Sequence, residues 1–150
     1  MFEESEQPTK WSIIASGEGA DRIALQYHTG FHNIAIEDRV LLLNTAAADV
    51  HPEKIFDYLI KKDVRVIEIS EKIKRERICI FGSSPGAGNV WKVGELQARE
   101  DFDTIRRYIS NLKIIEGDVI LTINTLGGGT GNGSTPYLIN ELKYGKVLIA

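Results

Sequence analysis

The chain has little cysteine, little net charge and no long apolar run. Cys79 is the one cysteine among 150 residues, so a disulfide framework is excluded and a reducing compartment is the simpler setting. No apolar run approaches the roughly 20 residues that span a bilayer, and the acidic start of the chain does not resemble a secretory signal. A net charge of −3 disfavours a general nucleic-acid binder. We therefore expect a cytoplasmic protein with no transmembrane segment and no nucleic-acid partner.

The chain does contain enough apolar sequence for one core. Its apolar fraction of 43% and charged fraction of 26% are ordinary for a globular protein, and a chain of this length buries roughly two thirds of its unfolded surface. We expect residues 1–10 to be a polar lead-in and residues 11–150 to be one structural unit. The last apolar run has no helix after it, so we expect this unit to be the front part of a longer protein.

Apolar and β-branched runs predict strands at residues 11–15, 39–43, 64–69, 77–81, 119–123 and 146–150. Apolar residues at three- and four-residue steps predict helices over residues 22–26, 51–60 and 92–112, and from about Asn132 to a cap at Gly145. The apolar stripe of the longest helix includes Leu96. Strands that alternate with helices predict an α/β fold, a Rossmann-like and mainly parallel sheet with helices on both faces.

Three clusters of glycine follow the predicted strands. They fall at residues 17–19, 82–88 and 127–133. The carboxyl ends of parallel strands share one edge of the sheet, and ligands bind there in such folds. We therefore expect the three clusters to converge on a single site.

The strongest signal is the third cluster, with five glycines in seven positions. So many glycines cost backbone entropy, and a physical reason to keep them is close approach of main-chain N–H groups to a polyphosphate. The helix that follows adds its unpaired N–H groups and the positive end of its dipole. We expect Thr130 and Ser134 to offer hydroxyls to phosphate oxygens. A merely flexible loop is disfavoured, since most strand-to-helix loops are short.

The other two loops fit no common nucleotide motif. The first, residues 16–22, fails the dinucleotide fingerprint because Arg22 stands at its last glycine, and Asn44 follows the second strand where an acidic residue is expected. No lysine stands where a P-loop needs one. The second, residues 82–89, is rich in small polar groups; taken alone it fits a solvent loop equally well, but together with the third cluster we expect it to form a second wall of the same anion site.

These loops together resemble the tubulin/FtsZ superfamily. Residues 127–133 match its signature G-G-G-T-G-[ST]-G, with Asn132 in the variable sixth place. Residues 43–50, Leu-Asn-Thr-Ala-Ala-Ala-Asp-Val, are similar to the second nucleotide loop in the form of the archaeal CetZ branch. Residues 86–89 with Gly94 are similar to the third loop, and residues 17–19 stand where the family has its first phosphate loop.

The resemblance implies the tubulin/FtsZ nucleotide-binding type of fold, with GTP or GDP and Mg²⁺ as cofactors. It implies self-association into cytoskeletal filaments, with hydrolysis completed between subunits by an acidic loop downstream of residue 150. No catalytic residue is therefore assigned here, and the remainder of the protein is expected further along the chain or as a separate piece. The nucleotide-binding residues that it implies are Gly17, Glu18, Gly19, Asn44, Thr45, Gly86, Ala87, Gly88, Asn89, Gly127, Gly128, Gly129, Thr130, Gly131 and Asn132.

Two carboxylates in the first loop would repel a phosphate. Glu18 and Asp21 must therefore point away from the anion or hold a cation. Glu18 is the candidate metal residue, because Mg²⁺ binds one or two carboxylates together with phosphate oxygens. Ala46 stands where FtsZ commonly has an aspartate, and Asp49 is a weaker substitute.

Two other functions remain open. One is a nucleotide-binding structural or regulatory protein that does not hydrolyse its nucleotide. The other is a Rossmann-type domain for NAD or FAD, against which Arg22 and Asn44 count.

Other conspicuous residues have structural explanations. His28 and His32 have the spacing of zinc ligands, but Gly30 between them disfavours a zinc site, and His51 begins a helix. Cys79 and Trp91 are expected in the core. The basic residues at 72–77 alternate with glutamates and are expected in a solvated turn.

Overall fold

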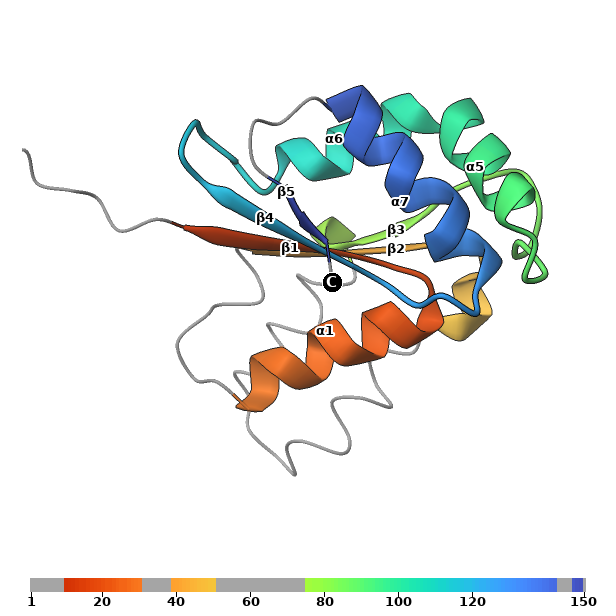
Figure 1. Cartoon of the computed structure of the whole chain (residues 1–150), viewed down its shortest axis with the longest axis horizontal. Coiled ribbons are helices and arrows are strands. Elements are labelled where there is room, and N and C mark those ends of the chain that lie inside the picture. Colours follow the sequence, from red (N-terminus) through yellow and green to blue (C-terminus); the bar gives the residue numbers. More distant parts are fainter. Residues whose placement is uncertain (1–9, 31–38, 51–74, 143–146, 150) are drawn as a thin grey trace, which may run out of the picture.

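The protein folds around a parallel five-stranded sheet, in a computed structural model that describes residues 10–30, 39–50, 75–142 and 147–149 (Figure 1). The elements in chain order are β1 (Trp11–Ser16), α1 (Glu18–Gly30), β2 (Val40–Asn44), the short 3₁₀ helix η1 (Ala47–Asp49), β3 (Ile78–Ile80), α5 (Trp91–Glu100), α6 (Phe102–Ser110), β4 (Val119–Asn124), α7 (Gly129–Leu142) and β5 (Val147–Ile149). The predicted α/β class is confirmed.

The strand order is β3-β2-β1-β4-β5, with β1 in the centre, and each neighbouring pair is parallel. In the register, Ile14 of β1 lies between Leu41 of β2 and Thr122 of β4. The chain moves from β1 toward β2 on one side and from β4 toward β5 on the other. The order therefore reverses between β1 and β4, and the carboxyl ends of these two strands form a crevice where ligands bind in such sheets.

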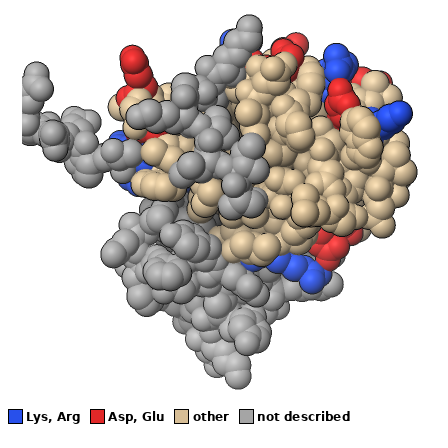
Figure 2. Space-filling model, in the orientation of Figure 1, with Lys and Arg blue, Asp and Glu red and all other residues tan. Residues whose placement is uncertain are grey.

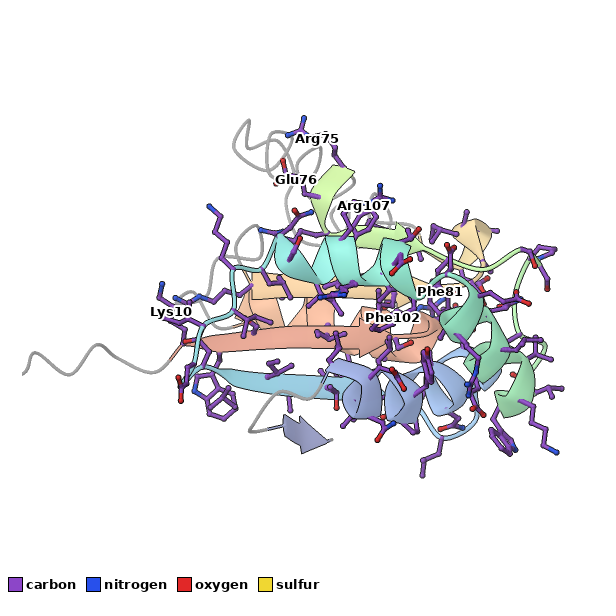
Figure 3. The ribbon with its side chains drawn as sticks, turned by 90° about the horizontal axis from the view of Figure 1, so that it is seen from above. Lys10, Arg75, Glu76, Phe81, Phe102 and Arg107 are labelled. Carbon is purple, nitrogen blue, oxygen red and sulfur yellow. The ribbon has the colours of Figure 1, made fainter. Side chains whose placement is uncertain are left out.

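Helices cover both faces of the sheet. Figure 1 shows α1 on one face and α5, α6 and α7 on the other. Every residue of β2 is buried, because successive side chains point to opposite faces and both faces are covered. Leu41 and Leu43 belong to the core cluster that also contains Phe81 and Ile105, whereas Val40 and Leu42 belong to the cluster on the α1 face. Figure 3 looks onto the three-helix layer, with Phe81 and Phe102 near the junction of α5 and α6.

The single helix predicted over residues 92–112 is wrong. The chain breaks at Asp101, whose φ of −111° and ψ of 23° end α5 and begin α6. The Asp101 carboxylate accepts a hydrogen bond from the Gly82 N–H at 3.0 Å, which ties the break to the loop after β3. The break changes the direction of the apolar stripe, so Leu96, expected in that stripe, is 53% exposed.

Trp91 also differs from the expectation of core packing. Its side chain is 52% exposed at the start of α5, with the Lys92 Nζ 5.7 Å from the ring centroid. Cys79, in contrast, is fully buried in β3 as predicted, and burial raises the pKa of its thiol to about 12. Cys79 is therefore an inert core residue.

Several expectations lie outside the described residues. They concern the lead-in before Lys10, the helix at 51–60, the strand at 64–69, the cap at Gly145, the basic residues Lys72 and Lys74, and the zinc ligand pair, including the side chain of His28.

The described part of the surface carries charges of both signs. On the face seen in Figure 2, acidic and basic side chains are mixed around the rim and the centre is uncharged. Within the described ranges, no helix has the length and apolar character needed to cross a membrane.

Candidate functional site

A cavity of about 770 Å³ lies at the carboxyl ends of the strands, within the size range of small-molecule sites. Four loops line it. They follow β1, β2, β3 and β4, and Figure 1 shows them gathered at one edge of the sheet, where α1 and α7 begin. The residues predicted from the sequence that line the cavity are Gly17, Glu18, Gly19, Asn44, Gly86, Ala87, Gly88, Asn89, Gly127, Gly128, Gly129, Thr130 and Gly131. The expected convergence of the glycine clusters is therefore observed.

Thr45 and Asn132 are not among the lining residues; they stand behind the wall of the cavity. The Thr45 hydroxyl is buried and lies 2.7 Å from the Thr130 hydroxyl. The Asn132 amide donates to the Leu126 carbonyl oxygen and accepts from the Asn124 side chain at 3.3 Å. Both side chains shape the loops that form the cavity, a role that a sequence motif does not distinguish from ligand contact.

Ser134 does not offer its hydroxyl to the cavity. It is fully buried and bonds to the Ser16 hydroxyl and to the Thr130 carbonyl oxygen, each at 2.7 Å. Ser134 therefore joins α7 to β1, and the expectation that it reaches a phosphate is wrong.

The glycines after β4 fall into two groups. A Cβ atom added at Gly127 would meet no atom within 4 Å, so this position borders open space. A Cβ at Gly129 would lie 2.5 Å from the Val90 backbone nitrogen, and one at Gly131 would lie 2.5 Å from the Ser16 carbonyl oxygen. Gly129 begins α7 and is not among the residues with positive φ. The lack of a side chain at Gly129 therefore allows two backbones to pack closely.

Two further glycines turn the backbone at the rim. Gly17 has a φ of +91° and Gly86 a φ of +97°, conformations that other residues rarely adopt. Their amides are used within the protein, since the Gly17 N–H donates to the Leu43 carbonyl oxygen at 2.8 Å and the Gly86 N–H to the Thr45 carbonyl oxygen at 3.2 Å. These glycines build the loops and do not present their own N–H groups to a ligand.

The first turns of α1 and α7 supply the attraction for an anion. The first N–H groups of a helix have no intrahelical acceptor and carry the positive end of the dipole. Both helices begin at the cavity, at Glu18 and at Gly129. Two helix amino termini at one cavity are an arrangement that favours the binding of an anion.

Basic side chains contribute nothing to this attraction among the described residues that line the cavity. These residues include Glu18 and Asp49 but neither Lys nor Arg. Glu18 forms an exposed ion pair with Arg22. No group of three or more His, Cys, Asp or Glu side chains within the described ranges could hold a metal ion without help from a ligand. A cation would therefore bind here through Glu18 together with oxygens of the bound anion, which fits the way Mg²⁺ is held at phosphates.

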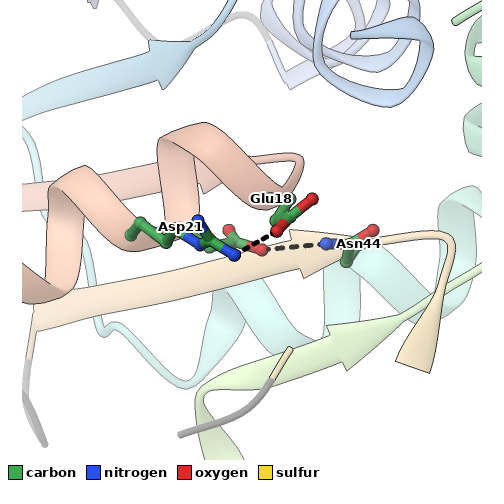
Figure 4. A network of polar contacts seen from close by, with 4 residues as sticks. Glu18, Asp21 and Asn44 are labelled. Atoms are coloured by element: carbon green, nitrogen blue, oxygen red, sulfur yellow. Dashed lines mark hydrogen bonds and ion pairs between the residues drawn. The ribbon is translucent and has the colours of Figure 1, made fainter. Parts of the chain in front are cut away.

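Asp21, unlike Glu18, does not line the cavity. It is 2% exposed, and its Oδ2 accepts a hydrogen bond from the Asn44 Nδ2 at 3.1 Å (Figure 4). Burial raises the pKa of Asp21 well above its usual value, the Asn44 hydrogen bond opposes this, and the charges of Glu18 and Asp49 add to it. Of the two alternatives predicted for Asp21, the structure shows the first: its carboxylate points away from the cavity.

The contact with Asp21 also fixes Asn44. The Asn44 Oδ1 accepts the Ala46 N–H at 3.1 Å, so both ends of its side-chain amide are engaged. This anchors the turn that leads into η1. Asp21 and Ala24, three residues apart in α1, are both buried, so Asp21 lies on the face of α1 that packs against the sheet.

Sequence reasoning missed other lining residues. Thr125 stands directly after β4, and Pro85 lies in the loop after β3. Residues 46–49, part of the loop that resembles the second nucleotide loop of the family, also line the cavity. Their position after a strand was the available signal.

The chain is similar to two curated proteins over most of its length. It is 29% identical to the tubulin-like protein CetZ1 of Haloferax volcanii over 136 residues, and 28% identical to the tubulin-like protein CetZ4 of the same organism. Each match covers 89% of this chain and 31% of the relative, so the chain spans about a third of the length of these proteins. No protein-family model matches the chain.

Solved structures show the same likeness in the fold. CetZ2 from Haloferax volcanii, described as a protofilament with GTPγS bound, matches with a TM-score of 0.63 at 23% identity over 94% of this chain and 39% of its own. CetZ1 from that organism, a monomer with GDP bound, matches with a TM-score of 0.62, and CetZ from Methanosaeta thermophila with 0.60. Sequence and fold together confirm the resemblance of this chain to the tubulin/FtsZ superfamily, through its CetZ proteins.

Proposed function

We propose that this chain is the nucleotide-binding part of a filament-forming, tubulin/FtsZ-like GTPase of the cytoplasm. The observation that carries the proposal is the meeting of four strand-end loops and two helix amino termini at one cavity. The similar CetZ proteins are described with GTPγS or GDP bound, and one of them as a protofilament, which supports the same ligands and self-association here.

In this proposal the polyphosphate lies against the first turns of α1 and α7. Their N–H groups and dipoles attract the anion, and Gly127 leaves room for it. Glu18 holds Mg²⁺ through one carboxylate, and the ion offsets phosphate charge in a site whose described lining has no basic side chain. Asn44 and Thr45 fix the opposite wall.

The described residues provide neither a guanine contact nor a catalytic acid that we can assign. We propose that both come from outside residues 1–150, the acid from a neighbouring subunit. The alternative without hydrolysis differs from this proposal only in that acid, whereas the dinucleotide alternative predicts a different ligand.

Titration calorimetry tests the ligand. The chain should bind GTP, GDP and inorganic triphosphate with Mg²⁺ present, and inorganic triphosphate should compete with GTP, because the phosphates supply the contacts. NAD and FAD should not compete. Tight binding of NAD or FAD with no binding of triphosphate would overturn the proposal in favour of the dinucleotide alternative.

A further inference from the structure

We infer that the amino-terminal edge of the sheet carries a second anion site, built for a phosphate group or another multiply charged oxyanion. A cavity of about 470 Å³ opens there. It lies at the opposite end of the strands from the nucleotide cavity and shares no lining residue with it. The residues that matter for the inference are Lys10, Ser12, Arg39, Arg77, Asn111 and Lys113.

The starts of three neighbouring strands bring three cations to this cavity. Lys10, Arg39 and Arg77 each stand directly before a strand, β1, β2 and β3 respectively. These strands are parallel neighbours with staggered starts, because the register pairs Val40 with Ile13 and Ile78 with Leu42, but the three side chains line the same cavity. Figure 3 shows Lys10 at the end of β1 that is far from the start of α5 and α7. A bound anion would offset the positive charge that these side chains bring to the cavity.

The cavity reaches below the charged surface of the protein. Arg77 is 4% exposed and Ser12 is 3% exposed, so the cavity has polar side chains in the interior of the protein. A guanidinium offers a planar fork of donors that matches the oxygens of phosphate and carboxylate groups. Lys113 joins from the turn after α6, where its φ of +50° is uncommon for a residue other than glycine.

The charge balance favours an anion. The described lining has four basic and two acidic side chains, a formal charge of +2. The two acidic ones have donors of their own, since Asp118 accepts the Ile115 N–H and Glu76 accepts an Arg75 guanidinium hydrogen, each at 3.0 Å. The nucleotide cavity has the opposite character, with acidic side chains in its lining and attraction from main-chain N–H groups. The two sites therefore recognise anions by different means.

Amide chemical shifts of the ¹⁵N-labelled chain, followed while inorganic pyrophosphate is added at constant ionic strength, locate the binding. The expected result is a saturating shift at Ser12, Asn111 and Lys113, separate from the response at Gly17 and Gly131 of the nucleotide cavity. A parallel titration with citrate distinguishes phosphate from carboxylate recognition, since the tighter ligand at this edge identifies the preferred group.

Variants then test the side chains. Arg39→Gln and Lys10→Gln should each weaken pyrophosphate binding at this edge about tenfold, the usual effect of one charge-assisted hydrogen bond. Arg106→Gln and Lys92→Gln, which remove exposed cations elsewhere, should leave it unchanged. Arg77 is left unchanged in these variants, because replacing a buried arginine would also alter folding, and the effect on binding could not be separated from it.

Three results would overturn the inference. They are shifts confined to the nucleotide cavity, an equal response to chloride, and an unchanged affinity in both Arg39→Gln and Lys10→Gln.

Discussion

A methyl group added at Gly127 would enter the nucleotide cavity without touching the protein, whereas one added at Gly129 would press on the backbone at Val90. The two glycines stand in one motif and have different physical roles. One leaves room for a ligand, and the other allows α7 to approach the loop after β3. Substitution at each position therefore separates binding from folding.

Gly127→Ala should weaken binding of GTP and of inorganic triphosphate about tenfold, a loss of about 1.4 kcal/mol, while the melting temperature stays the same. Gly127 is not among the residues with positive φ, so alanine fits the backbone there. Calorimetry and thermal melting measure the two effects. Ser83→Ala, an exposed position outside the cavity lining, is the control and should change neither. Equal affinity in Gly127→Ala and the original chain would remove this residue from the site.

Asp21→Asn should stabilise the protein at high pH. Because the pKa of Asp21 is raised by burial, the folded state holds a proton that the unfolded state has lost, and stability falls as pH rises above about 4 through the raised pKa. Asparagine stays neutral, so the variant should be more stable than the original chain at pH 8 and equally stable at pH 3.

Urea unfolding across pH measures this difference. Glu116→Gln, an exposed carboxyl in the turn before β4, should leave the pH dependence as it is. Parallel stability curves for Asp21→Asn and the original chain would show that Asp21 is charged when folded.

At the scale of elements, the close crossing of α5 and α7 positions two walls of the cavity. A Cβ at Gly133 would overlap the Trp91 carbonyl oxygen, and a Cβ at Gly94 would overlap the Gly129 carbonyl oxygen. The two helices therefore touch through their backbones. Since α5 follows the loop at 85–89 and α7 follows the loop at 125–128, this crossing sets the distance between two walls of the cavity.

Gly133→Ala should lower the free energy of unfolding by about 3 kcal/mol, the upper end of what an overpacked core costs, and should weaken nucleotide binding as a consequence. Denaturant unfolding followed by calorimetry on the folded fraction measures both. Asn140→Ala, on the exposed side of the same helix, is the matched control and should be neutral. A fully stable Gly133→Ala variant would mean that the helices separate more easily than their packing indicates.

The secondary structure shows where local sequence was sufficient. The strand at 119–123 and the start of β1 were predicted almost to the residue, because buried parallel strands are continuous apolar runs. The helix predicted over 92–112 failed at Asp101, because the hydrogen bond from Gly82 that fixes the break comes from a residue 19 positions away.

At the scale of the whole molecule, hydrolysis is the property that this chain should lack. The 150-residue chain should release phosphate from GTP at a negligible rate even when it binds the nucleotide, because the proposed acid lies on a segment beyond it. A phosphate-release assay measures this, with Gly127→Ala as the background. Release at the rate of a longer form that includes the downstream loop would place the acid within residues 1–150.

The sequence alone determined the class of fold and the edge at which the site lies. Buried apolar runs force parallel strands, and glycines that follow them must gather where those strands end. Tertiary structure decided which groups face the cavity. Thr45, Ser134 and Asn132 carry polar groups suited to phosphate, yet each bonds within the protein, because packing between distant segments buries or engages them. A motif records residue types, whereas the direction of a side chain depends on neighbours that the motif does not contain.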